Sequence, residues 1–197
     1  MSWKVAPWER PVANMKIADK QKLLGVVAPR MLSVSGTTIG LWALAWTFLT
    51  CGCRDSTVVT SSMWPTIKRG ETVSVDYTAY AVAAPKRWDV VTFEPPMFTT
   101  QVWAMRVVAL PGETVSFATG SITVNGQLLT LPPHVTNVTY VSLDDPVFPH
   151  AGGGTASPYV VPPNSYFVLG DNSANANDSR FWGAIPRTNI FGRVRNK

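Results

Sequence analysis

Gln101-Val-Trp-Ala-Met-Arg-Val-Val-Ala-Leu-Pro-Gly-Glu113 is the stretch that decides the fold. Its β-branched and aromatic residues predict a buried strand over 101–110, and Pro111-Gly112 predicts the turn that ends it. Asn125-Gly126, between two further β-rich runs, is a strong hairpin signal. Other short strands are expected at 56–60, 72–76, 89–93, 116–124, 138–141 and 165–169. Regularly spaced short strands with such turns predict a mostly β fold, an antiparallel barrel or sandwich.

The composition of the chain supports a β fold with a substantial core. The chain has 197 residues, and its 16 Pro and 14 Gly argue against a helical bundle. Eight Trp, eight Phe and five Tyr are enough to bury a core, which excludes a wholly disordered chain. The only two cysteines, Cys51 and Cys53, exclude a disulfide-rich scaffold.

The net charge of +5 is concentrated in the N-terminal arm. Residues 1–30 carry six basic and two acidic side chains, whereas residues 54–197 carry eleven basic and ten acidic ones. The main domain is therefore close to neutral. Because the residues that neutralise a phosphate backbone are not clustered there, we expect no nucleic-acid partner.

Residues 31–53 carry no charge and are predicted to form a membrane anchor. A helix of that length spans about 35 Å, enough for a hydrocarbon core of about 30 Å. The alternative is a cleaved secretory signal, which the long preceding arm and the lack of a small-x-small cleavage site disfavour. The positive-inside rule puts residues 1–30 in the cytoplasm and residues 54–197 across the membrane, with a loop-rich insertion at 127–160.

Three stretches are candidates for the functional site. Ser61-Ser-Met-Trp-Pro-Thr66 follows a β-branched run and can expose a serine hydroxyl on a sharp bend. The strand over 101–110 is the second. The third runs from Gly170-Asp-Asn172 to Asp178-Ser-Arg180, where a pair of Arg180 with Asp178 or with Asp171 is expected to brace one loop against another. Each stretch alone is equally compatible with a purely architectural role.

Together and in this order, the three stretches resemble the type I signal peptidase family. Ser62-Met-Trp-Pro-Thr66 resembles the nucleophile motif of that family, and Arg106-Val-Val-Ala-Leu-Pro-Gly-Glu113 is similar to the strand that carries its general base. Residues 161–194 resemble its C-terminal block, including Gly170-Asp-Asn172 and Asp178-Ser-Arg180. The resemblance runs from about residue 58 to residue 194, apart from the insertion.

The resemblance implies a membrane-bound serine endopeptidase that removes signal peptides from exported preproteins after small residues. It implies a bacterial inner membrane with the catalytic domain in the periplasm, the lipid bilayer as a partner, and neither a metal nor another cofactor. Ser62 would attack the scissile carbonyl, and the Ser62 N–H and the Thr60 hydroxyl would stabilise the oxyanion. Val58 and Ala104 would line the pocket for small side chains. Such a peptide binds extended along strand edges.

The sequence departs from the family pattern at the general base. The family uses a lysine that burial keeps neutral, but Met105 occupies that position here, and a thioether cannot take the proton of a serine. The family serine that often bonds this lysine is replaced by Ala176. Neither Lys68 nor Lys86 is an obvious substitute, and His134 and His150 lie in the insertion.

Three interpretations therefore stay open. The protein is a working signal peptidase that recruits its base from elsewhere, a pseudoenzyme that binds exported segments without cutting them, or a regulatory autoprotease of the related repressor-cleavage fold. The anchor and the lack of a DNA-binding domain count against the third. The intact Ser62 turn and C-terminal block favour the peptidase.

Overall fold

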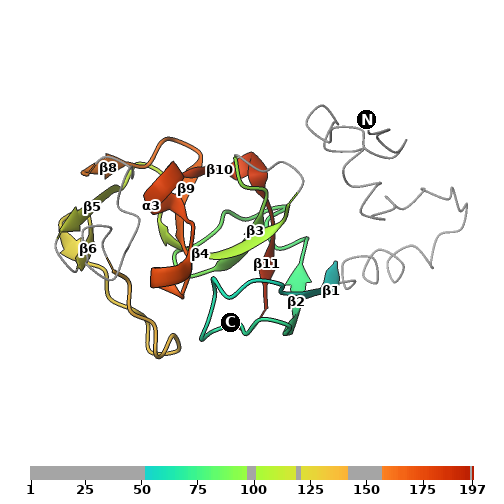
Figure 1. Cartoon of the computed structure of the whole chain (residues 1–197). Helices are drawn as coiled ribbons and strands as arrows, with labels where there is room; N and C mark the ends of the chain where they lie inside the picture. The colour runs from blue at the N-terminus through green and yellow to red at the C-terminus, as the bar shows by residue number, and fades with distance from the viewer. Residues whose placement is uncertain (1–51, 97–100, 119–120, 142–156, 196) are drawn as a thin grey trace, which may run out of the picture.

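The computed structural model describes residues 52–96, 101–118, 121–141, 157–195 and 197 (Figure 1). The strands are β1 Cys53–Thr57, β2 Thr72–Asp76, β3 Val90–Phe93, β4 Trp103–Ala109, β5 Thr114–Ala118, β6 Ser121–Val124, β7 Gln127–Leu128, β8 Tyr159–Val160, β9 Ser165–Leu169, β10 Ile185–Pro186 and β11 Ile190–Val194. Between β9 and β11 lie the 3-10 turn η2 Ser173–Asn175, the short helix α3 Ser179–Trp182 and the 3-10 turn η3 Arg187–Asn189.

The strands form two antiparallel sheets. The larger sheet has the order β1-β2-β11-β3-β4-β9-β10, and the smaller has the order β7-β6-β5-β8. In Figure 1 the smaller sheet lies at one end of the molecule and β1 and β2 lie at the other. The prediction of a mostly β, antiparallel fold is confirmed. The larger sheet is open, with β1 and β10 at its edges, so the described strands do not close a barrel.

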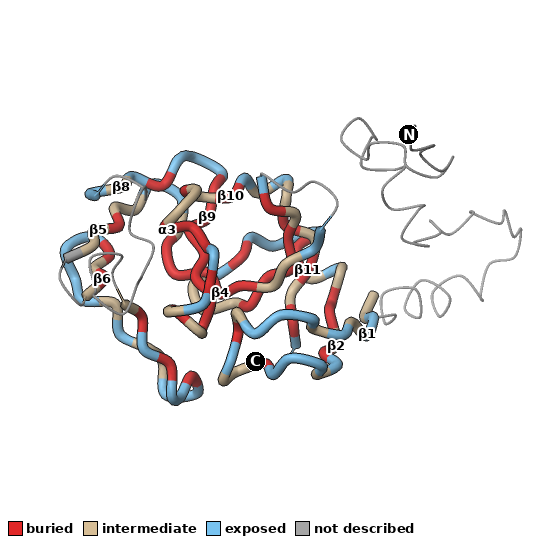
Figure 2. The backbone as a smooth tube through the Cα atoms, viewed as in Figure 1, coloured by how far each residue is buried: buried red, intermediate tan, exposed pale blue. Residues whose placement is uncertain are grey.

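Strands β4 and β9 pair with each other and are shared between two hydrophobic cores. All five residues of β9 are buried, and they alternate between the two faces of the strand. Tyr166 and Val168 belong to the core beneath β2, β3 and β11, whereas Phe167 and Leu169 belong to the core beneath the smaller sheet. The buried positions concentrate in the middle of the molecule (Figure 2). The position of the segment that follows β9 is therefore fixed by two hydrophobic cores, one on each face of β9.

Local turn chemistry determines the hairpins as the sequence predicts. Asn125 and Gly126 both have positive φ, 53° and 76°, which a two-residue hairpin turn of type I′ requires. Gly112, with φ 82°, reverses the chain between β4 and β5. The long strand that ends at Pro111-Gly112 is thus confirmed as β4.

Four expected elements differ from the structure. The expected strand over 116–124 is two antiparallel strands, β5 and β6, which pair with each other from Val115–Val124 to Ala118–Ser121. The first strand spans Cys53–Thr57 and not 56–60, because its partner β2 pairs Cys53 with Asp76 and Thr57 with Thr72. Residues 138–141 are not a strand, although Val138 and Tyr140 are buried in the core beneath the smaller sheet. The insertion at 127–160 begins and ends in strands, β7 and β8, which extend that sheet.

The predicted anchor lies almost entirely outside the described residues. Residues 1–51 are not described, and Cys53, the last residue of the expected anchor, is already the first residue of β1. Among the residues that are described, no helix has the length and apolar character that a membrane crossing requires.

Candidate active site

Residues 61–67 form a tight turn that presents Ser62 near the surface, and it is called the nucleophile turn because Ser62 is the expected nucleophile. Met63 and Ile67 are fully buried, and the Ile67 N–H donates to the Met63 carbonyl at 2.8 Å. Ser62 itself is half-buried, and its Oγ lies 3.1 Å from the Thr60 Oγ1, within hydrogen-bond distance. The two apolar side chains therefore anchor the turn while the two hydroxyls stay near solvent.

The segment after β9 fixes the backbone of this turn. The Asn172 N–H donates to the Ser62 carbonyl at 2.9 Å, and its side-chain amide donates to the Ser61 carbonyl at 3.0 Å. Gly170 passes so close that a β-carbon on it would lie 2.7 Å from the Ser62 carbonyl oxygen and 2.4 Å from the Ala176 β-carbon. The close approach requires glycine at 170. The structure thus brings Ser62, Gly170 and Ala176 together.

A buried ion pair connects the same segment to β4. Arg106 and Asp171 are both fully buried at their side chains, with Nη2 2.6 Å from Oδ2 and Nε 2.9 Å from Oδ1. The Asp171 carboxylate also accepts the Thr66 hydroxyl of the nucleophile turn and, at 2.7 Å, the Tyr140 hydroxyl. The remaining guanidinium nitrogen, Nη1, donates to the Trp88 carbonyl at 3.0 Å. One carboxylate therefore links β4, the nucleophile turn and the insertion.

The electrostatics of this pair favour the charged form of Arg106. Burial lowers the pKa of Arg106, but the hydrogen bond and the charge of Asp171 outweigh it and raise that pKa above its ordinary value. Burial also raises the pKa of Tyr140 well above its ordinary value, and the neighbouring Asp171 charge adds to this shift. Tyr140 therefore stays neutral and keeps its donor.

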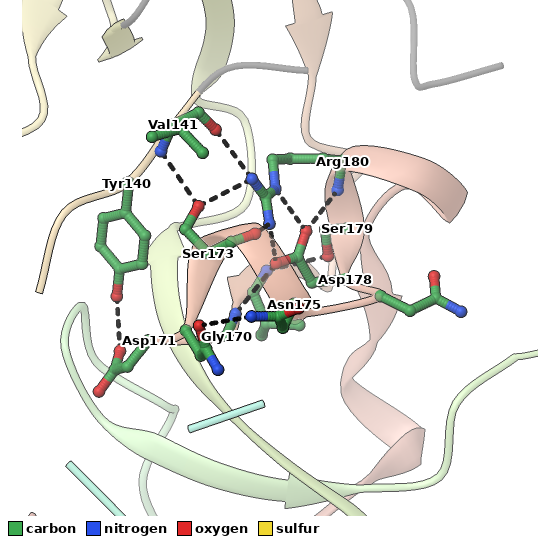
Figure 3. Close-up of polar contacts among 12 residues, drawn as sticks. Tyr140, Val141, Gly170, Asp171, Ser173, Asn175, Asp178, Ser179 and Arg180 are labelled. Atoms are coloured by element: carbon green, nitrogen blue, oxygen red, sulfur yellow. Dashed lines mark hydrogen bonds and ion pairs between the residues drawn. The ribbon is translucent and has the colours of Figure 1, made fainter. Parts of the chain in front are cut away.

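A second buried pair, Arg180 with Asp178, closes the loop that follows β9 (Figure 3). Arg180 Nη2 lies 2.8 Å from Asp178 Oδ2, and its Nη1 donates to the Ser173 hydroxyl and the Val141 carbonyl, each at 2.8 Å. Asp178 Oδ2 also accepts the Gly170 N–H at 3.1 Å. Burial raises the pKa of Asp178, although the Arg180 charge opposes this shift.

Of the two alternative partners expected for Arg180, the structure has Asp178. Arg180 pairs with Asp178, whereas Asp171 pairs with Arg106. The reason is geometric, because Leu169 faces Arg106 in the β4–β9 register and directs the following carboxylate toward β4. The Arg106–Asp171 and Arg180–Asp178 pairs are therefore two separate ion pairs.

The remaining predicted site residues lie on β4 or next to the nucleophile turn. Met105, expected at the position of the family base, is only 2% exposed and belongs to the core beneath β2 and β3. Val58 and Ala104 are half-buried and pack against that core. Trp103–Met105 pair with β3 on one side, whereas pairing with β9 begins only at Arg106. This part of β4 therefore has a backbone edge that β9 does not cover.

The basic groups considered as substitutes for the lysine lie elsewhere. Lys68 and Lys86 are exposed in turns, and His134 is exposed on the insertion. His134, Lys86 and Thr66 line a common cleft, and Ser62 is not among the residues that line it. His150 lies outside the described residues.

Sequence reasoning missed the contacts of Tyr140, Thr66 and Asn172. Thr66 and Asn172 lie inside recognised motifs, so their positions were visible but their partners were not. No local signal indicated the role of Tyr140, because its hydroxyl reaches Asp171 across 31 residues of sequence.

Comparisons with known proteins identify the family. The family model described as signal peptidase, peptidase S26, matches residues 30–197. The chain is 32% identical to a signal peptidase I of Leptolyngbya laminosa over 95% of this chain and 85% of that protein. It is 29% identical to a probable signal peptidase I-2 of Synechocystis over 70% of this chain and 59% of that protein.

One solved structure is similar as well. A signal peptidase I from Enterococcus faecalis matches 57% of this chain and 97% of its own, with 29% identity and a TM-score of 0.43. The family-model match and the Leptolyngbya relative are sufficient for the assignment: the chain belongs to the signal peptidase family, peptidase S26.

Proposed function

We propose that this protein is a membrane-anchored serine endopeptidase of the signal peptidase I type. It cleaves signal peptides from exported preproteins after small residues, and Ser62 is its nucleophile. The observation that carries the proposal is the pair of near-surface hydroxyls, Ser62 and Thr60, 3.1 Å apart on a turn whose backbone is fixed from the segment after β9.

The reaction would proceed through an acyl-enzyme. Ser62 Oγ attacks the scissile carbonyl carbon and loses its proton, the amine of the mature protein leaves, and water hydrolyses the ester. The oxyanion is stabilised by the Ser62 N–H and the Thr60 hydroxyl. In support of this role, no described residue accepts a hydrogen bond from the Ser62 N–H. Since Met105 cannot take a proton, water is the base in the unmodified protein, and turnover is slow.

The uncovered edge of β4 supports binding of an extended peptide. A substrate strand added along the edge of Ala104 and Met105, which β9 does not pair, would hydrogen-bond to the backbone there, and these bonds would supply affinity. Val58 and Ala104 would then line the pocket that admits only small side chains. The lipid bilayer is the second partner of this function.

The topology is part of the proposal. Residues 1–30 lie in the cytoplasm, residues 31–53 cross a bacterial inner membrane once, and residues 54–197 fold outside it as the catalytic domain. The absence of charge from 31–53 and the basic side chains of 1–30 support this orientation.

A second candidate function is a disarmed enzyme that binds exported segments without cutting them. The burial of Met105 favours it, because a 2% exposed thioether in an apolar core leaves no titratable group at the position of the family base. Ala176, which lies beside Gly170 and the Ser62 carbonyl, likewise offers no hydroxyl to orient an amine. The same peptide edge would serve both functions.

Preprotein cleavage in proteoliposomes distinguishes the two candidates. The full chain is compared with Ser62→Ala and with Met105→Lys, which restores an amine at the base position. Slow cleavage by the wild type that disappears in Ser62→Ala supports the peptidase. If the wild type does not cleave the preprotein but Met105→Lys does, the protein is a disarmed enzyme. Cleavage that is unchanged in Ser62→Ala refutes the assignment of the nucleophile.

A further inference from the structure

A cleft of about 880 Å³ opens beside the end of the nucleophile turn, where Pro65 and Thr66 form its border. Its other walls come from segments that are distant in sequence: 86–90 at the start of β3, 134–137 in the insertion and the C-terminal end of β11 with the residues after it. Ser62 does not line this cleft. The cleft therefore borders the candidate active site without reaching Ser62, and its role goes beyond the proposed function.

The lining of this cleft is strongly cationic. A single carboxylate, that of Asp89, belongs to it, against six basic side chains: Lys86, Arg87, Arg106, Arg193, Arg195 and Lys197. Three of the six already have close partners. Arg106 is paired with Asp171 at 2.6 Å, Arg87 with Glu113 at 2.5 Å and Lys197 with Glu71 at 2.6 Å. Lys86, Arg193 and Arg195 are the basic residues of the cleft that have no such close ion pair among the described residues.

The two arginines of this remaining set are only loosely paired. Arg193 Nη1 is 3.9 Å from Asp89, and Arg195 Nη2 is 3.5 Å from Asp76, whereas an ordinary N–H···O bond spans about 2.7–3.2 Å. Their side chains are 44% and 47% exposed. A guanidinium has five N–H donors, so most donors of both arginines are open to a ligand.

Each of the two carboxylates that approach these arginines accepts shorter hydrogen bonds on its other oxygen. Asp89 Oδ2 accepts the Tyr80 hydroxyl at 2.9 Å and the Lys86 N–H at 3.0 Å. Asp76 Oδ1 accepts the Thr78 N–H at 2.9 Å and its hydroxyl at 2.7 Å. The oxygens nearest the arginines are Asp89 Oδ1 and Asp76 Oδ2, at 3.9 and 3.5 Å, so an incoming anion displaces no short ion pair.

Trp88 supplies an unusual wall of the same cleft. Its φ is 75°, a left-handed conformation that bulky residues rarely adopt. The conformation is held in place by Arg106 Nη1, which donates to the Trp88 carbonyl, and by the Trp88 N–H, which donates to the Val107 carbonyl at 2.8 Å. A backbone outlier maintained by a buried arginine points to a site and not to an unconstrained loop.

We propose that this cleft binds a phosphate-bearing anion, with its oxygens seated between Arg193, Arg195 and Lys86. Guanidinium groups bind phosphate through paired N–H donors, and the Lys86 ammonium adds a point charge. Two sources of this chemistry are considered, a soluble phosphate and the headgroup of an anionic phospholipid.

The sheet register explains why a lipid is one of these sources. Arg193 pairs with Asp76 of β2, and Asp76 pairs with Cys53 of β1. Neighbouring strands lie about 4.8 Å apart, so the Arg193 backbone is about 10 Å from Cys53. Cys53 is the residue at which the expected anchor ends. The cleft therefore begins close to the level at which the chain leaves the bilayer.

Hydrogen exchange tests the proposal on the full chain in phosphatidylcholine nanodiscs. The reporters are the hydrogen-bonded amides of Lys86, Trp88 and Asp89, measured in inorganic phosphate and in chloride at equal ionic strength. Phosphate at ten times its dissociation constant is expected to slow their exchange about tenfold. A second arm replaces part of the phosphatidylcholine by phosphatidylglycerol.

The decisive variant is Arg193→Gln/Arg195→Gln, which should lose the slowing. Arg54→Gln/Arg69→Gln removes the same charge from exposed arginines outside the cleft and should keep it. If the first double variant does not fold, Lys86→Gln replaces it, because the exposed Lys86 side chain has no ion pair among the described residues.

The outcomes distinguish the two sources of the anion and can overturn the proposal. Slowing by inorganic phosphate identifies a soluble anion as the source, and slowing by phosphatidylglycerol alone identifies a lipid headgroup. The proposal is overturned if neither probe slows exchange, or if the control double variant loses as much slowing as the cleft variant. Ser62→Ala must keep the effect, so failure of the proposed peptidase activity stays distinguishable from failure of this site.

Discussion

Replacing Asp171 by alanine is expected to destabilise the protein more than any other single loss of charge described above. The Asp171 side chain is fully buried, and its carboxylate receives donors from Arg106, the Thr66 hydroxyl and the Tyr140 hydroxyl. The substitution leaves the Arg106 guanidinium fully buried without its counter-ion. It also leaves the hydroxyls of Thr66 and Tyr140 without this acceptor.

The expected cost follows from these contacts. Breaking a buried ion pair by removing one partner costs about 3–5 kcal/mol, most of it from the charge that stays behind. This is a large part of the 5–15 kcal/mol that typically stabilises a domain. Because Thr66 belongs to the nucleophile turn, the variant should also lose order around Ser62.

The assay is urea unfolding of the full chain in detergent, followed by tryptophan fluorescence. Glu113→Ala is the matched control, since it breaks the Arg87–Glu113 pair, whose side chains are 28% and 18% exposed. That loss should cost about 1 kcal/mol. Equal costs for the two variants, or a cost below about 1 kcal/mol for Asp171→Ala, would refute the reasoning from burial.

Three further predictions concern the same region and the acid stability of the fold. Gly170→Ala should cost about 1–3 kcal/mol in urea unfolding, because its β-carbon would lie 2.7 Å from the Ser62 carbonyl, and an unchanged midpoint would contradict this close approach. Tyr140→Phe should cost about 1.5–3 kcal/mol, because it removes a donor to the buried carboxylate described above, and a neutral result would mean that this bond adds nothing. Burial raises the pKa of Asp76, but hydrogen bonds from the Thr78 hydroxyl and N–H outweigh this and lower it below 3.8. Its stabilising effect should therefore be present above pH 3.8 and disappear as the pH falls through the lowered pKa, so that wild type and Asp76→Asn converge in acid; a constant difference would contradict the shift.

Local chemistry made the strands and turns of this chain predictable. The Asn125-Gly126 hairpin depends on positive φ at two adjacent residues, and the turn at Gly112 depends on the same property. The buried strand β4 was visible because its apolar residues form one run between turn signals. In each case a few neighbouring residues contain all the information that is needed.

The contacts of the site were not predictable in the same way. The choice of Arg106 over Arg180 as partner of Asp171 depends on the β4–β9 register, which no short stretch encodes. Tyr140 belongs to a run that resembles a strand, yet it is a loop residue whose buried hydroxyl serves that carboxylate. The cationic cleft likewise assembles from segments more than 100 residues apart, and the near-neutral charge of residues 54–197 conceals it.

The most direct test of the assignment of Ser62 compares two variants in one cleavage assay. Met105→Lys supplies an amine at the base position, and Met105→Lys/Ser62→Ala removes only the hydroxyl from that background. If Ser62 is the nucleophile, the initial rate of preprotein cleavage should fall at least about 1000-fold between the two. Equal rates of cleavage by the two variants would contradict the account.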